Sequence, residues 1–132
     1  MPPTQGYVFD DNCIAAASLA TKQGFAVKIT AANKNVNLCA AVTDIGYGIL
    51  MNKPASGAGA LVRVLGNAEA VSDGSGTAIS VGDKVGPDAN GRLVKVTTVD
   101  RPVMGTALDA SSALGTLIRV NLTPNAVYRT PA

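Results

Sequence analysis

Short runs of valine, isoleucine and leucine alternate along the chain with clusters of glycine, proline, asparagine and aspartate. Within several runs every second residue is polar or charged, as in Val62-Arg63-Val64. Alternation with a period of two is typical of strands that have one buried and one wet face. Because the turn-forming clusters recur every ~8–12 residues, the pattern predicts a mainly β protein. The expected architecture is a small antiparallel β-barrel or sandwich.

Three antiparallel hairpins are expected after the first third of the chain. Pro54 lies in the loop of the first hairpin. Asn90-Gly91 in the second hairpin is a tight-turn signal, because both residue types accept positive φ. Gly105, inside a strand of the third hairpin, suggests a bulge or a close approach of two backbones. The paired strands are 48–52 with 60–65, 84–85 with 92–97, and 103–108 with 116–122.

The N-terminal part of the chain has a weaker pattern. Asp11-Asn12 are residue types that cap helices, and the alanine-rich stretch 15–20 favours a short helix. An extended arm is the alternative, because the stretch is short and weakly amphipathic. Strands are expected next, at 25–30 and 36–40. We therefore divide the chain into an N-terminal arm with a candidate short helix, residues 1–24, a β-domain, residues 25–122, and a C-terminal arm, residues 123–132.

The amino-acid composition argues against several classes of function. The chain has 132 residues, of which 15% are charged against a usual ~25%, and its net charge is +2. Such a weak positive charge argues against an electrostatic nucleic-acid binder. Histidine is absent, which removes Ser-His-Asp catalysis, Cys-His pairs and imidazole metal ligands. We therefore expect no enzyme, no cofactor, no bound metal and no nucleic-acid partner.

The chain also lacks the signals that would direct it to a membrane or out of the cell. No apolar run approaches the ~18 residues of a membrane span, and Met1-Pro2-Pro3 has no basic region of a signal peptide. We expect a protein made in the cytoplasm, without a membrane partner. Cys13 and Cys39 are expected to be two small buried hydrophobic residues, and a disulfide is the alternative.

Leucines recur on strand faces that an arginine or lysine marks as wet. The cations themselves, Arg63, Lys95 and Arg119, are expected to be solvated, because a nucleic-acid stripe would need interleaved aromatics. Leucines repeated on three strands instead predict contact with another subunit or a partner. The candidate contact residues are Tyr7, Val8, Phe9, Leu61, Leu65, Leu93 and Leu117, and the candidate structural turns are Pro54, Asn90 and Gly91.

Four stretches of turns and strand ends stand out as a series: 48–54 (GILMNKP), 81–85 (VGDKV), 88–92 (DANGR) and 105–110 (GTALDA). Over about residues 25–122 this series resembles the head decoration, or capsid cement, proteins of tailed bacteriophages. The resemblance implies a partner in the major capsid protein, a homotrimer, and a place on the outer surface of the capsid in the virion. Such proteins stabilise the icosahedral shell, and the family implies no cofactor and no reaction. The fold class expected is thus mainly β and β-tulip-like, with extended arms.

Two alternatives remain open at the level of sequence. Within the structural class, the alternative is a head-fibre base or another virion surface attachment protein. In a different class, it would be a small β-barrel ligand-binding protein or enzyme. That class requires a deep pocket with convergent polar groups, and the sequence offers no cluster of residues to line one. An exposed contact surface would instead favour the structural class.

Overall fold

Every regular element in residues 8–127, the part of the chain described by this computed structural model, is a β-strand. The mainly β class predicted from the alternating pattern is confirmed. In chain order the strands are β1 (Phe9–Ala15), β2 (Ala26–Ala31), β3 (Asn35–Leu38), β4 (Gly48–Leu50), β5 (Gly59–Asp73), β6 (Lys84–Pro87), β7 (Leu93–Lys95), β8 (Pro102–Ala107) and β9 (Leu114–Val127).

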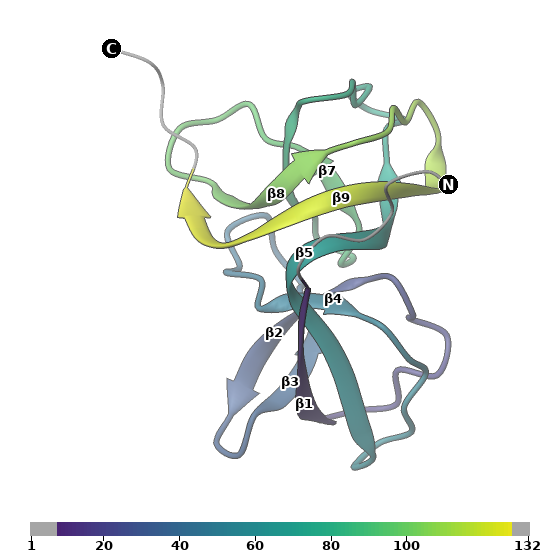
Figure 1. Cartoon of the computed structure of the whole chain (residues 1–132), viewed down its shortest axis with the longest axis vertical. Helices are drawn as coiled ribbons and strands as arrows, with labels where there is room; N and C mark the ends of the chain where they lie inside the picture. The colour runs from purple at the N-terminus through teal and green to yellow at the C-terminus, as the bar shows by residue number, and fades with distance from the viewer. Residues whose placement is uncertain (1–7, 128–132) are drawn as a thin grey trace.

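The strands close into two rings that share β5 (Figure 1). The N-terminal barrel has the order β1-β3-β2-β4-β5 and is closed by the pairing of β1 with β5. The C-terminal barrel has the order β5-β7-β6-β8-β9 and is closed by the pairing of β5 with β9. The pairs β1–β3 and β5–β7 are parallel, and the other pairs are antiparallel. The expected antiparallel barrel is therefore two joined barrels with two parallel contacts.

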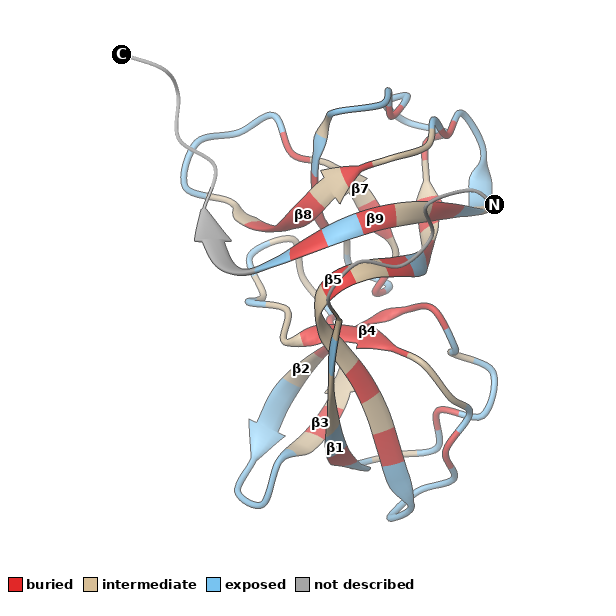
Figure 2. Ribbon diagram, in the orientation of Figure 1, coloured by how far each residue is buried: buried red, intermediate tan, exposed pale blue. Residues whose placement is uncertain are grey.

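Strand β5 passes from one barrel to the other without losing its alternation. Side chains at even positions point into the two interiors: Val62 and Ala70 are fully buried, and Val64 is half-buried against the core of the N-terminal barrel. Figure 2 shows the resulting alternation of buried and partly exposed residues along the ribbon. Gly66 stands at the crossing with a φ of 94°, a conformation that L side chains rarely adopt. Glycine at this position lets one strand bend between the two rings.

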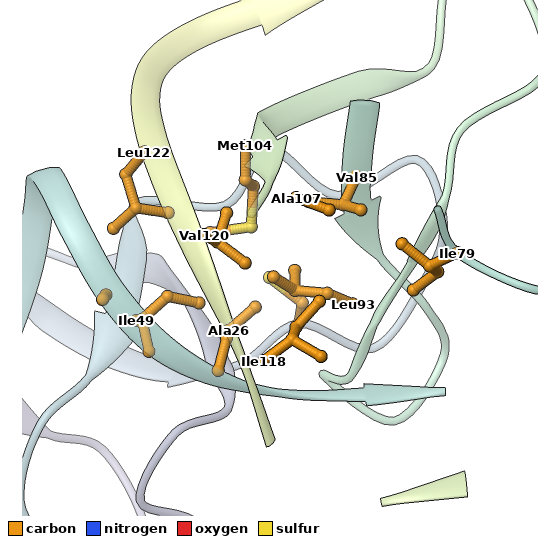
Figure 3. Packing of buried hydrophobic residues seen from close by; sticks show 13 residues of the cluster. Ala26, Ile49, Ile79, Val85, Leu93, Met104, Ala107, Ile118, Val120 and Leu122 are labelled. Atoms are coloured by element: carbon orange, nitrogen blue, oxygen red, sulfur yellow. The ribbon is translucent and has the colours of Figure 1, made fainter. Parts of the chain in front are cut away.

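Two buried clusters fill the barrels. The cluster of the N-terminal barrel includes Leu19, Val36 and Val62. The larger cluster of the C-terminal barrel also takes in Ala26, Ile49 and Cys39 from the neighbouring barrel. Figure 3 shows Ala26 and Ile49 beside Ile118 and Val120 in this cluster. Because each fully buried aliphatic side chain contributes about 1.5–3 kcal/mol, the shared cluster couples the two barrels into one folding unit.

Backbone contacts at the turn between β6 and β7 reinforce the junction between the two barrels, which we call the seam. The Ala26 amide donates a hydrogen bond of 2.7 Å to the Gly91 carbonyl, which joins β2 to the opposite barrel. Gly91 has a φ of 80°, and a Cβ on it would lie 3.2 Å from the Ala26 carbonyl oxygen. The predicted turn at Asn90-Gly91 is confirmed. It supports the seam between the barrels as well as its own hairpin.

The three predicted hairpins are confirmed by the strand pairings β4–β5, β6–β7 and β8–β9. The pairing of β8 with β9 shifts register between Val103 and Gly105, as expected for a bulge. A Cβ on Gly105 would lie 2.3 Å from the Asn121 carbonyl oxygen. The predicted close approach of two backbones is therefore present at Gly105.

The N-terminal segment differs from its expectation. No helix occurs at 15–20 or elsewhere in the described residues, and Phe9–Ala15 forms strand β1. Cys13, Ala15 and Leu19 are buried, so residues 9–24 belong to the barrel instead of forming an arm. Alanine favours helix locally, but pairing with β5 and burial of Cys13 outweigh that preference.

The C-terminal end of the described residues also differs from its expectation, whereas the cysteines agree with theirs. Strand β9 continues to Val127 and pairs with β8 there, so 123–127 extend the sheet where an arm was expected. Residues 1–7 and 128–132 lie outside the described part of the chain. Cys13 and Cys39 are both free and buried, which confirms that they act as small hydrophobic residues.

Replacing Gly91 with valine is expected to destabilise the protein by about 2 kcal/mol or more, because positive φ and crowding against Ala26 act together. Gly57→Val is the matched control, since Gly57 has the same φ of 80° but nothing within 4 Å of its Cβ position. Denaturant melts of both variants measure the difference. Equal losses of stability in the two variants would show that the turn at Gly91 does not support the seam.

Candidate interaction surface

The outward side of β5 forms a continuous strip along both barrels. Its side chains at odd positions, from Leu61 to Val71, are all at least partly exposed, while those at even positions fill the two interiors. Residues directly opposite on antiparallel strands present their side chains on the same face. Phe9 lies opposite Leu65, and Leu117 lies opposite Val71. We call this surface the β5 face; it consists of Phe9, Leu61, Arg63, Leu65, Asn67, Glu69, Val71, Leu117 and Arg119.

The β5 face brings together contact candidates from distant parts of the sequence. Phe9 is 50% exposed and Leu117 is 58% exposed, which is high for large apolar side chains. Leu61 and Leu65 are half-buried on the same strip. Val8 is half-buried just before β1, and Tyr7 lies outside the described residues. Residues from β1, β5 and β9 thus meet on one surface.

Leu93 does not belong to this surface, and its assignment as a contact residue is wrong. The Leu93 side chain is fully buried in the cluster of the C-terminal barrel. Strand β7 pairs with β6 on one side and with Ser72 of β5 on the other, which turns Leu93 inward. The strand ends at Lys95, and Val96 beyond it is also buried. Alternation with Lys95 was too short a pattern to identify the inner face.

The β5 face is hollowed into a groove of about 560 Å³ where the two barrels meet. Met51 and Leu117 supply its apolar surface, and the charged side chains of Arg63, Glu69 and Arg119 also line it. Sequence reasoning missed the contributions of Gln23, Gly24 and Met51, which only the loop after β1 and the end of β4 bring to this place. The full lining is Gln23, Gly24, Leu50, Met51, Arg63, Asn67, Ala68, Glu69, Leu117 and Arg119.

The cations of the β5 face are already paired within the protein. Arg63 donates hydrogen bonds of 2.7 and 3.1 Å to the Asp10 carboxylate, and a third of 3.0 Å to the Asn67 carbonyl. Arg119 donates two hydrogen bonds, of 2.8 and 3.0 Å, to the Asp109 carboxylate. Since each carboxylate offsets one guanidinium charge, the groove is close to neutral. The expectation that these cations are simply solvated is incomplete, because both are fixed by ion pairs.

These ion pairs shift the titration of the groups involved. Hydrogen bonds from the Arg119 side chain and backbone lower the pKa of Asp109 to about 2. The Asp10 carboxylate raises the pKa of Arg63, so this cation keeps its charge at neutral pH. The third predicted cation, Lys95, lies 3.6 Å from the Asp83 carboxylate and away from the groove.

The turn candidates have structural contacts. Pro54 is buried, and its carbonyl accepts a hydrogen bond of 2.9 Å from the Leu19 amide. The Asp88 carboxylate accepts hydrogen bonds from the Asn90 and Arg92 amides, which fixes the turn that contains Gly91. These residues hold loops in place and do not line the groove.

Residues 8–127 also bear on three other kinds of site: a metal centre, a membrane span and a reactive thiol. This part of the chain contains no group of three or more His, Cys, Asp or Glu side chains arranged to hold a metal ion. None of its elements is a helix long and apolar enough to cross a membrane. Burial raises the pKa of the Cys39 thiol to about 12, which keeps it protonated and unreactive at neutral pH.

Two closed barrels around a shared strand, with an outer face whose two arginines are paired internally, define a double-barrel β protein. The profile of the phage cement protein family matches residues 48–122, from the start of β4 into β9. Since this segment is more than half of the 132 residues, the chain belongs to the phage cement protein family. Proteins of this kind are virion components located on the capsid.

A solved structure shows the same fold. It is described as the head fiber gp8.5 N base in bacteriophage phi29, and it superposes with a TM-score of 0.63. The two chains are 17% identical, and the match covers 93% of this chain and 100% of that chain. No curated protein sequence matches the chain significantly. The resemblance to phage decoration proteins inferred from turns and strand ends is confirmed by the family match.

The Asp109–Arg119 pair predicts a specific loss of stability in acid. Because the folded-state pKa of Asp109 is about 2 against an ordinary 3.8, its contribution is complete above pH 3.8 and is lost as pH falls through 2. Asp109→Asn should therefore lose less stability than the wild type between pH 4 and pH 2 in urea melts. Arg119→Gln should reduce the loss of stability over the same pH interval by a similar amount. A pH profile of Asp109→Asn as steep as that of the wild type would contradict this role.

Proposed function

We propose that the protein binds the outer surface of the icosahedral capsid of a tailed phage and stabilises the shell as a decoration, or cement, protein. The observation that carries this proposal is the family match over residues 48–122. That segment contains β5 and the part of β9 that bears Leu117 and Arg119. The major capsid protein is the proposed partner.

The β5 face is the proposed contact surface with the capsid. Its exposed apolar side chains, Phe9 and Leu117, gain about 25 cal/mol for each Å² removed from water on binding. Arg63 and Arg119 keep their ion pairs inside the protein, so docking need not strip them of a partner. A surface of this kind suits tight packing against a partner better than long-range electrostatic attraction.

The protein is proposed to act as a homotrimer, as the family resemblance implies. Two exposed isoleucines that do not belong to the β5 face support self-association. The ion pair between Lys28 and Asp44 joins two segments, and Ile29 and Ile45, the next residues of those segments, are both exposed. A trimer would present several copies of the β5 face to the capsid and so multiply modest contacts through effective concentration.

The proposed role requires no chemistry from the chain. We propose that the protein is not an enzyme and uses no cofactor, because histidine is absent and the two arginines of the groove are engaged by Asp10 and Asp109. We further propose that it is synthesised in the cytoplasm of the host and joins the virion on its outer surface.

A second candidate function is the base of a head fibre or another virion surface attachment. The observation that favours it is the fold shared with the head fiber gp8.5 N base of bacteriophage phi29. The two candidates differ in consequence. A cement protein raises the thermal resistance of the shell, whereas an attachment base is not required to do so.

Leu117→Ser is expected to weaken binding to heads that lack this protein by about 10-fold or more, because it removes an exposed anchor from the β5 face. The isolated variant should melt within a few degrees of the wild type, since surface changes seldom exceed about 0.5 kcal/mol. Val81→Ser is the matched control, as Val81 is 67% exposed but lies on the loop before β6. Co-sedimentation with heads measures binding, and calorimetry of the decorated heads measures stabilisation.

Each outcome has a definite meaning. Equal binding by Leu117→Ser and the wild type would remove the β5 face from the contact. Saturating binding of the wild type without any rise in the melting temperature of the heads would contradict the cement function and favour the attachment base.

A further inference from the structure

The first half of β1 contributes no buried side chain to the core of the N-terminal barrel. Phe9 and Asn12 are exposed, and Asp10 and Asp11 are half-buried. The buried part of the strand begins only at Cys13. We call Phe9–Asn12 the strap. No apolar side chain of the core is lost when these residues leave β5.

The strap is fastened by two adjacent carboxylates that reach three different elements. The Asp10 carboxylate accepts two hydrogen bonds from Arg63 of β5. The Asp11 carboxylate accepts a hydrogen bond of 2.8 Å from Lys34 in the turn between β2 and β3. It also accepts a hydrogen bond from the Tyr47 hydroxyl, just before β4. These contacts take the place that apolar anchors occupy in the other half of the strand.

The backbone of the strap is paired on one side only among the described strands. Strand β3 pairs with Ile14 and Ala15 and does not reach the strap. The ladder with β5 shifts register between Phe9 and Asp10, which interrupts it near the chain end. A one-sided, interrupted ladder without buried side chains has the features of a locally unstable segment.

We propose that the strap opens from β5 as a unit while both barrels stay folded, and that the contacts of Asp10 and Asp11 set the open fraction. Opening uncovers the edge of β5 between Leu61 and Leu65, at one end of the β5 face. The strap thereby controls access to that edge. This inference concerns the isolated protein and does not depend on capsid binding.

The charged and titratable groups that face the strap define its response to pH. They are Arg63 on β5, Lys34 in the β2–β3 turn, Tyr47 before β4, and Cys13 on β1 itself. Hydrogen bonds from Lys34 and Tyr47 hold the pKa of Asp11 below its usual 3.8, so protonation of Asp11 favours the open strap. Asp11 raises the pKa of Lys34, and it raises that of Tyr47 to about 12, so both groups keep their protons at neutral pH. The closed strap is therefore stable at neutral pH and is expected to open as the pH falls below 3.8.

Amide hydrogen exchange followed by NMR tests the proposal on the full chain. The Ile14 amide donates to the Lys34 carbonyl just before β3, whereas the Ala15 amide donates to the Ala58 carbonyl just before β5, so the amides of Asp11 and Cys13 also point toward β5. At pH 7 the protection factor of the Asp11 amide should be at least ~10-fold below that of Cys13. Asp11→Asn should lower protection at position 11 about 10-fold further and leave Cys13 unchanged. Asp44→Asn is the matched control, because it removes a carboxylate–lysine pair outside the strap.

A disulfide across the strap provides a second arm that does not require Asp11 to be changed. Phe9→Cys with Leu65→Cys places two thiols on directly opposite residues. The oxidised protein should protect the Asp11 amide as strongly as Cys13, and reduction should return the wild-type difference. Equal protection of Asp11 and Cys13 in the reduced protein and in the wild type, at pH 7 and at pH 3, would overturn the proposal. In that case the strap would open only with global unfolding.

Discussion

The structure depends on one constraint: a single strand, β5, has to serve as a wall of two closed barrels. Neither barrel holds a large core, because small rings bury few side chains. Sharing β5 places the rings in contact, and Ala26, Ile49 and Cys39 then complete the core of the neighbouring barrel. Gly66 makes the sharing possible, since its positive φ bends the strand at the crossing.

The interaction surface is a consequence of the same constraint. Because both interiors use the even positions of β5, its odd positions are left on one outward strip. The strip gains neighbours from β1 on one ring and β9 on the other, which is why Phe9 and Leu117 share a face. Ion pairs from Arg63 and Arg119 to carboxylates nearby hold the strip in shape without leaving much net charge on it. A rigid, nearly neutral face suits close packing against a large partner.

The family match and the fold match cover different parts of the chain. The family match covers residues 48–122, where the hairpins and their turns have clear local patterns. It leaves out β1, β2 and β3, the part whose pattern along the sequence was weakest. The fold match nevertheless covers 93% of the chain at 17% identity, so the first barrel is conserved in shape between the two proteins. A fold alone does not assign a function, and the proposed contact role is therefore argued from the family and the β5 face.

The sequence by itself determined the strand-rich class, the three hairpins, the turn at Gly91 and the close approach at Gly105, because alternation and turn chemistry are local. Tertiary structure decided the rest. Residues 9–15 form a strand because they pair with β5, some fifty residues away, and because this pairing buries Cys13. Leu93 points inward because β5 and β6 flank its short strand. The groove exists only where both barrels meet. Pairing between distant segments is selected by burial and ring closure, and no local run of residues contains that information.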